Sequence, residues 1–278
     1  METAEFIRVL DREGQALAEA AERAGPGAEV RTCPGWRVRD LVRHTGMVHR
    51  WATAFVAEGH TSYHPDGGLP DLDGAELLDW FRRGHRRLVG TLAAAPPDVD
   101  CWSFLPAPSP LAFWARRQAH ETTVHRVDAE SALGDGTAPG GEGALGGDEP
   151  APGGEPAPGG RPGAIAVDFA VDGIEELLFG FHARGRSRVR TAEPRVLSVR
   201  ATDTDAAWTV RLSSGPPAAE RHAAPAAGQG QVVQADCELT GTAVQLYLAL
   251  WNRRPVPGMT GDAALAELWR ERSGVTWS

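Results

Sequence analysis

The sequence predicts a helical domain followed by a smaller α+β domain. Over roughly the first 180 residues, outside residues 134–163, apolar side chains recur every three to four positions, the period of helices that bury one face. After Arg190 the period changes to two, which is typical of half-buried strands. Because 278 residues suffice for two domains, we expect residues 1–188 to be helical and residues 189–278 to be of α+β type.

The composition predicts a soluble globular protein that does not bind nucleic acid. Hydrophobic residues make up 42% of the chain and charged residues 23%, and the net charge is −9. A nucleic-acid binder usually presents a basic face, which this balance does not suggest. Every basic residue is Arg, a bias that we attribute to codon usage and not to a ligand.

We expect a cytoplasmic protein that does not insert into a membrane. The N-terminal residues Met1 to Glu5 are acidic and no apolar run follows them, unlike a signal peptide. No apolar stretch approaches the length of a membrane span. The cysteines Cys33, Cys101 and Cys237 are odd in number and far apart, which fits a reducing compartment better than a disulfide framework.

Four amphipathic helices are predicted before residue 134. Gly25-Pro26-Gly27 marks the end of the first, and Ser109-Pro110 caps the start of the fourth. The expected spans are 4–24, 38–56, 74–93 and 110–133.

Residues 134–163 differ from the rest of the chain. Eighteen of these thirty residues are Gly or Pro, and Glu-Pro-Ala-Pro-Gly-Gly occurs twice in tandem. Such a segment buries too little apolar surface to offset its ordering entropy, so we expect a disordered surface loop. An apolar-periodic helix at 165–181 follows at once, and we expect it to pack on the bundle.

The C-terminal part predicts strands and two helices. Residues 195–199 and 208–212 alternate like strands, and residues 232–239 form a third candidate strand. Residues 243–251 and 263–272 are predicted to be helical.

Three residues form a candidate metal site. Glu121 and His125 lie four apart on one predicted helix and therefore share a face. His44 lies on the apolar stripe of another helix, between Leu41 and Val48. Two His and one carboxylate suit zinc, and other divalent metals accept the same donors. Spacing alone leaves plainer alternatives open: His44 as a core residue, and Glu121 paired with Arg117 one turn earlier.

The sequence resembles the mycothiol-dependent maleylpyruvate isomerase family in four places. The first is Cys33-Pro34-Gly35-Trp36 with Asp40-Leu41-Val42, His44 and His49-Arg50-Trp51, and the second is the run from His120 to Glu130. Asp168 to Glu176 resembles the fourth bundle helix of the family. Ala201-Thr202-Asp203-Thr204 with Trp208, and Gly241 to Arg253, resemble its smaller domain.

The resemblance implies a DinB-like four-helix bundle followed by a C-terminal α+β domain of sterol-carrier-like type. It places residues 134–163 as an insertion between the third and fourth bundle helices. It implies His44, Glu121 and His125 as ligands of Zn²⁺ or another divalent metal, and mycothiol as cofactor or co-substrate. It also aligns Arg253, our candidate catalytic residue, with an arginine near the end of the family's C-terminal helix that reaches the active site. The plainer interpretation of Arg253 is a cation at a helix C-terminus.

We therefore expect an isomerase or S-transferase that activates a low-molecular-weight thiol for reaction with a small electrophile. The alternatives are a non-catalytic metal- or ligand-binding protein of the same fold, and a metal-free bundle in which His and Glu satisfy each other. Asp128 is a candidate to orient His125, unless it faces solvent. We expect Cys33 to be a structural thiol, and His49 and His120 to have structural or supporting roles.

Overall fold

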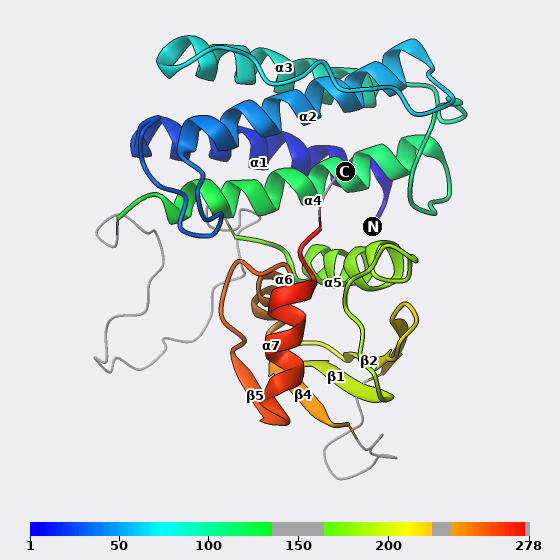
Figure 1. Cartoon of the computed structure of the whole chain (residues 1–278). Helices are drawn as coiled ribbons and strands as arrows, with labels where there is room; N and C mark the ends of the chain where they lie inside the picture. Colours follow the sequence, from blue (N-terminus) through cyan, green and yellow to red (C-terminus); the bar gives the residue numbers. More distant parts are fainter. Residues whose placement is uncertain (135–163, 224–234, 276–278) are drawn as a thin grey trace, which may run out of the picture.

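The structure is a computed structural model that describes residues 1–134, 164–223 and 235–275. A layer of long helices lies above a smaller part made of short helices and a sheet (Figure 1). This arrangement confirms the predicted fold class, an α-helical N-terminal part followed by an α+β part.

The N-terminal part is a bundle of four helices. They are α1 (Thr3–Ala24), α2 (Val38–Glu58), α3 (Gly74–Ala94) and α4 (Pro110–Ser131), and each agrees with its predicted span to within two residues. α1 packs along α4, and α2 along α3, with further contacts between α1 and α3 and between α2 and α4. The cap predicted for α4 is present, because the Ser109 side chain accepts a hydrogen bond from the Ala112 amide and Pro110 follows it.

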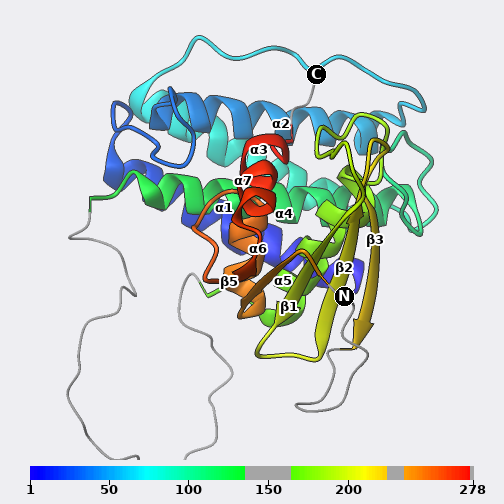
Figure 2. The same cartoon turned by 60° about the horizontal axis from the view of Figure 1, so that its bottom comes forward.

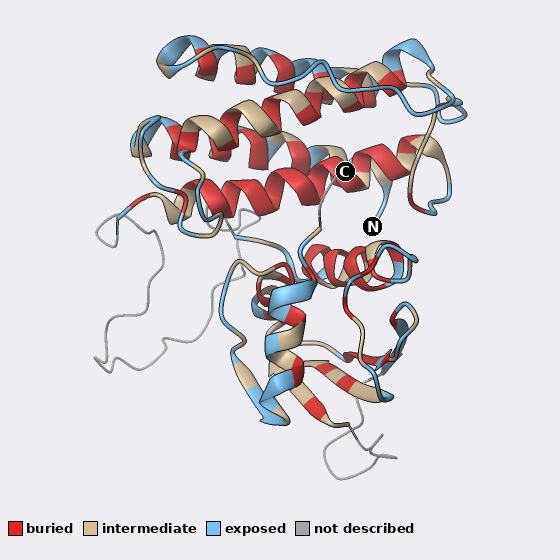
Figure 3. Cartoon of the chain, in the orientation of Figure 1, coloured by how far each residue is buried: buried red, intermediate tan, exposed pale blue. Residues whose placement is uncertain are grey.

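Helix α4 is buried along almost its whole length (Figure 3). The other three bundle helices cover one side of it, and the C-terminal part covers the other. Charged groups are therefore buried with it and paired: Arg126 donates to Glu13 of α1 over 2.8 Å, and Arg117 pairs with Glu176. Such pairs offset the cost of taking charges out of water.

The C-terminal part contains a five-stranded sheet in the order β3-β2-β1-β4-β5. β1 and β4 pair in parallel, and the other neighbours are antiparallel. Figure 2 shows β1, β2 and β3 side by side. The strands are β1 (Arg195–Ala201), β2 (Ala206–Leu212), β3 (Ala218–Ala223), β4 (Cys237–Gly241) and β5 (Gly258–Gly261).

Helices α6 (Ala243–Leu250) and α7 (Ala263–Arg272) complete this part and confirm the predicted spans. Two strands were not predicted. β3 is almost entirely exposed and lacks apolar alternation, and β5 is the four-residue segment Gly-Met-Thr-Gly. Of the strand expected at 232–239, β4 begins at Cys237, and residues 232–234 lie outside the described residues.

The helix predicted at 165–181 consists of α5 (Val167–Glu175) and one π-helical turn, η1 (Glu176–Phe181). It is not the fourth bundle helix, because α1 to α4 already form the bundle. One face of α5 meets the bundle, with the ring of Phe169 4.2 Å from that of His120. Its backbone lies against α6, where the indole of Trp251 donates to the carbonyl of Gly173 over 3.1 Å.

The Gly/Pro-rich segment thus follows the fourth bundle helix and does not separate the third from the fourth. Residues 135–163 lie outside the described residues, so the disorder expected for them stays a prediction, as does the domain boundary at residue 188. One apolar core runs from the bundle through α5 and α6 into the sheet. Among the described residues, no helix is long and apolar enough to cross a membrane.

The contact between α5 and α6 depends on a glycine. A Cβ atom at Gly173 would lie 2.3 Å from a ring carbon of Tyr247 and 2.8 Å from one of His120. We expect Gly173→Ala to destabilise the protein by about 1–3 kcal/mol, because rigid rings must shift. The matched control is Gly90→Ala on α3, where a Cβ atom meets nothing within 4 Å. This substitution should stabilise the protein by about 0.5–1 kcal/mol. Urea unfolding followed by circular dichroism measures both, and equal effects would show that α5 and α6 do not need this close approach.

Candidate metal centre

Three side chains from α2 and α4 converge on one point. One donor atom from each of His44, Glu121 and His125 lies within 4.8 Å of the others. Glu121 Oε1 is the common neighbour, 3.4 Å from His44 Nε2 and 3.1 Å from His125 Nε2. Within the described ranges, this is the one cluster of His, Cys and carboxylate side chains with such spacing.

The helix geometry explains the convergence. Glu121 and His125 lie one turn apart and face α2, and His44 faces them from a helix packed against α4. The plainer pairing considered for Glu121 is also present, because Arg117 Nη2 donates to Glu121 Oε2 over 3.0 Å. The two pairings use different oxygens, so the bond from Arg117 leaves Oε1 directed toward the histidines.

Asp128 orients His125. Its Oδ2 lies 2.8 Å from His125 Nδ1, so the imidazole Nε2 points at Glu121. Asp128 is fully buried and does not face solvent. A carboxylate behind a ligating histidine fixes its tautomer and direction, as is usual in protein metal sites.

Arg253 lies behind Asp128. Its Nε and Nη2 each donate to an Asp128 oxygen over 2.9 Å, and Thr32 donates to Oδ1 over 2.5 Å. Burial alone would raise the pKa of Asp128, but His125 and Arg253 hold it well below its usual value. Asp128 therefore stays ionised and keeps its hold on His125.

The same charges act on the donor residues. Burial would raise the pKa of Glu121, but the charge and hydrogen bonds of His125, the hydrogen bond to His44 and the charge of Arg117 lower it far below its usual value. Burial would lower the pKa of His125, but Glu121 and Asp128 together raise it to about 9. The carboxylate is thus ready to bind a cation, while His125 must first release a proton.

The cluster lies at the wall of a cavity of about 400 Å³ between the bundle and the C-terminal part. Trp36 contacts both histidines, with its ring 5.1 Å from His44 and stacked 6.4 Å from His125. The opposite wall comes from the segments after α6 and α7, including Arg253 and Val275. The cavity thus gives a small molecule access to the three side chains.

Cys33 also lines this cavity, with Sγ 4.0 Å from Arg253 Nη2. Burial and the negative charge of Asp128 raise the pKa of its thiol to about 12. Without a bound ion, Cys33 is therefore protonated near neutral pH and is a poor nucleophile.

The two histidines beside the cluster have other partners. His49 is fully buried and shares a hydrogen bond with Thr122 over 2.9 Å, and burial lowers its pKa well below the usual value. His120 lies 2.8 Å from Asp172 and 3.2 Å from the hydroxyl of Tyr247. Both tie helices together and neither belongs to the three-donor cluster.

Sequence reasoning missed two features of the site. It considered Asp128 and Arg253 separately, and their pairing spans 125 residues, so no local spacing reveals it. It also missed the buried pair of Arg117 with Glu176 in η1, which steadies the arginine that contacts Glu121. The family-like segment ending at Glu176 was the one available signal.

Two family models match the chain. The mycothiol maleylpyruvate isomerase N-terminal domain matches residues 7–130, and the MDMPI C-terminal domain matches residues 168–268. The first contains all three donor residues, and the second contains Arg253 and begins at α5. No curated protein and no solved structure matches the chain.

We predict that the protein binds one divalent ion per chain and that Glu121→Gln abolishes this binding. The substitution keeps the shape of the side chain but removes the charge that both histidines face. The matched control is Glu130→Gln, which lies on the same helix and pairs with Arg126 over 2.7 Å, away from the cluster. Metal analysis after dialysis against zinc, with calorimetric titration, gives stoichiometry and affinity. A wild type that takes up no metal, or a Glu121→Gln variant that binds as tightly as wild type, would refute the site.

Metal binding should also release a proton from His125. Because the pKa of His125 is about 9 in the metal-free protein, the metal competes with one proton below that pH. Affinity should therefore fall about tenfold for each pH unit from 9 to 7, and proton release should fade above pH 9. Calorimetry in two buffers of different ionisation enthalpy measures the release, and a value near zero at pH 7 would contradict this prediction.

Proposed function

The chain belongs to the mycothiol maleylpyruvate isomerase family, and from this premise we propose that it is a metal-dependent enzyme that uses a thiol. The thiol is mycothiol, and the substrate is a small electrophilic molecule. The reaction is an isomerisation or the transfer of the thiol to that electrophile. Zinc is the proposed metal, although the donor set also accepts other divalent ions.

The observation that carries the proposal is the convergence of His44, Glu121 and His125 at the wall of a cavity. Three donors suit a divalent ion that keeps a position for an exogenous ligand. A bound ion of this kind coordinates a thiol sulfur and lowers its pKa, which makes a thiolate available near neutral pH. The ordered carboxylate of Asp128 supports the same proposal, since it fixes His125 in the direction that a ligand requires.

The chain has no activated thiol of its own in this cavity. Cys33 lines the cavity, but its raised pKa of about 12 keeps it protonated. Without a bound ion, Cys33 is thus no ready source of thiolate at this place. We therefore favour an exogenous thiol over a cysteine nucleophile.

We propose that Arg253 acts as a positioning residue and also presents its guanidinium to the cavity. It holds both oxygens of Asp128, which in turn holds His125. The plainer interpretation, a cation at the end of α6, does not account for these two bonds or for its position in the cavity wall.

The three free cysteines fit the reducing cytoplasm, where we place the protein.

The proposal is tested with cobalt in place of zinc, because cobalt reports on its ligands by visible absorption. Addition of mycothiol to the cobalt protein should produce a sulfur-to-metal charge-transfer band, since a soft thiolate binds such an ion well. The Glu121→Gln variant, which cannot hold the ion, should show no band.

The control is Cys33→Ser, which should retain the band because the sulfur comes from mycothiol. Loss of the band in this variant would assign the sulfur to Cys33. A cobalt protein whose spectrum does not respond to mycothiol or to other cellular thiols would refute thiol activation. The non-catalytic metal-binding function would then replace it.

A further inference from the structure

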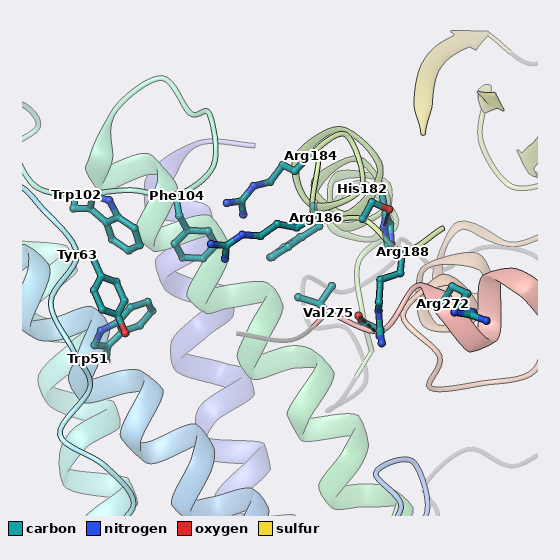
Figure 4. A pocket seen from close by; sticks show the side chains of 13 residues that line it. Trp51, Tyr63, Trp102, Phe104, His182, Arg184, Arg186, Arg188, Arg272 and Val275 are labelled. Atoms are coloured by element: carbon teal, nitrogen blue, oxygen red, sulfur yellow. Dashed lines mark hydrogen bonds between the residues drawn. The ribbon is translucent and has the colours of Figure 1, made fainter. Parts of the chain in front are cut away.

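A second and larger cavity lies beside the cavity that His44, Glu121 and His125 line, which we call the metal cavity. Its volume is about 780 Å³, and it opens between the bundle and the segment that follows η1 (Figure 4). Neither the metal donors nor Arg253 line it. Its two sides differ in chemistry, one aromatic and the other basic.

The aromatic side comes mainly from the bundle and its loops. Four rings pack on one another edge to face, obliquely or, for one pair, stacked, with ring centroids 5.6–6.5 Å apart: Trp51, Tyr63, Trp102 and Phe104. The indole of Trp51 donates to the carbonyl of His64 over 2.6 Å, which fixes this wall before any ligand arrives. Tyr63 is 64% exposed, so most of its ring is accessible to a ligand.

The basic side comes from Arg184, Arg186, Arg188 and Arg272. In Figure 4, Arg184 and Arg186 extend toward Phe104 from the segment after η1, and Arg188 and Arg272 lie beyond Val275. Within the part of the chain that the structure describes, no carboxylate lies within ion-pair distance of these four guanidinium groups. Other arginines of the chain, such as Arg116, Arg126 and Arg200, have carboxylate partners.

The arginine segment is held in place by its own contacts. Arg190 donates to the carbonyls of Gly185, Ser187 and Ser214 over 2.5–3.0 Å. His182 and Ser187 share a hydrogen bond over 3.0 Å. The segment that carries Arg184 and Arg186 is thus fixed at both of its ends.

An aromatic wall facing guanidinium groups without carboxylate partners matches one class of ligand. The rings offer a flat apolar surface against which another ring stacks. The guanidinium fork binds the two oxygens of a carboxylate or phosphate. A neutral apolar ligand would leave the arginines unused, and a bare inorganic anion would leave the aromatic wall unused.

We propose that this cavity binds an aromatic oxyanion, a flat ring system that carries a carboxylate or a phosphate. Gly274 and Val275 line both this cavity and the metal cavity, so an occupant lies next to the metal donors. The substrate class of the proposed enzyme is therefore an electrophilic molecule that carries such an aromatic oxyanion group. This last step rests on the proposed function, whereas binding of the ligand does not.

The test uses 1-naphthoate, 1-naphthyl phosphate and the neutral 1-naphthamide, with the quenching of tryptophan fluorescence and calorimetry as readouts. Trp51 and Trp102 lie in the wall, so a stacked ring should quench their emission. Naphthoate or naphthyl phosphate should bind at least tenfold more tightly than naphthamide, and the tighter of the two identifies the anionic group. Acetate and inorganic phosphate should not displace them at equal concentration.

Matched variants separate the two walls. Arg184→Gln with Arg186→Gln should weaken naphthoate at least tenfold and leave naphthamide unchanged, whereas Arg8→Gln, an exposed arginine that lines neither cavity, should change neither. Tyr63→Ala should weaken both probes. Unchanged binding of the tighter anionic probe in the double arginine variant, or the absence of binding of both naphthoate and naphthyl phosphate in wild type, would overturn the proposal.

A further variant separates this proposal from the metal-dependent function. Glu121→Gln should still bind naphthoate with wild-type affinity, because Glu121 does not line this cavity. Naphthoate binding without metal-dependent thiol activation would support the cavity and refute the proposed function. Thiol activation without binding of either anionic probe would support the proposed function and refute the aromatic-oxyanion site.

Discussion

The structure depends on one constraint: helix α4 is buried on all sides and yet carries charged side chains. A buried charge without a partner costs several kcal/mol, so each charge on α4 needs a partner on a neighbouring element. These partners come from α1, α2, η1 and the end of α6, in the pairs Arg126–Glu13, Glu121–His44, Arg117–Glu176 and Asp128–Arg253. The same contacts that satisfy α4 therefore fix the C-terminal part against the bundle and close the wall of the cavity beside the candidate metal donors.

Most of the fold could be predicted from the sequence, because most helices and strands are determined by local sequence patterns. The four bundle helices show apolar stripes and caps such as Ser109-Pro110, which act within a few residues. Strands β3 and β5 were not predicted, because β3 has no apolar face and β5 is only four residues long. Only their pairing with β2 and β4 shows that they are strands. The position of α5 relative to the bundle was not predicted either, because it too depends on contacts between distant parts of the chain. α5 has the periodicity of a bundle helix, but only contacts across the chain show that it fills the space between α4 and α6.

The candidate site could be predicted only in part. Helical spacing places Glu121 and His125 on one face, and the family-like motifs add His44. Spacing cannot show that Glu121 turns one oxygen to Arg117 and the other to the histidines, since that depends on how α2 and α4 cross. Nor can it show that Asp128 meets Arg253, because those residues meet only once the C-terminal part has docked. Local spacing thus predicts the candidate metal donors, whereas the groups that orient them depend on tertiary contacts.

The arginine–aromatic cavity shows why net charge decides less about ligands than local pairing does. A net charge of −9 describes the field far from the surface, and salt screens that field beyond about 8 Å. At the cavity, an anion meets guanidinium groups without carboxylate partners, and one or two such forks suffice to hold a small oxyanion. A nucleic acid instead needs many phosphate contacts along an extended basic face. The expectation that the chain does not bind nucleic acid is therefore compatible with an anion site, because the two depend on different lengths of basic surface. The number of arginines in the sequence could not distinguish these cases; their recurrence at residues 184, 186 and 188, next to the aromatic residues of the bundle loops, does.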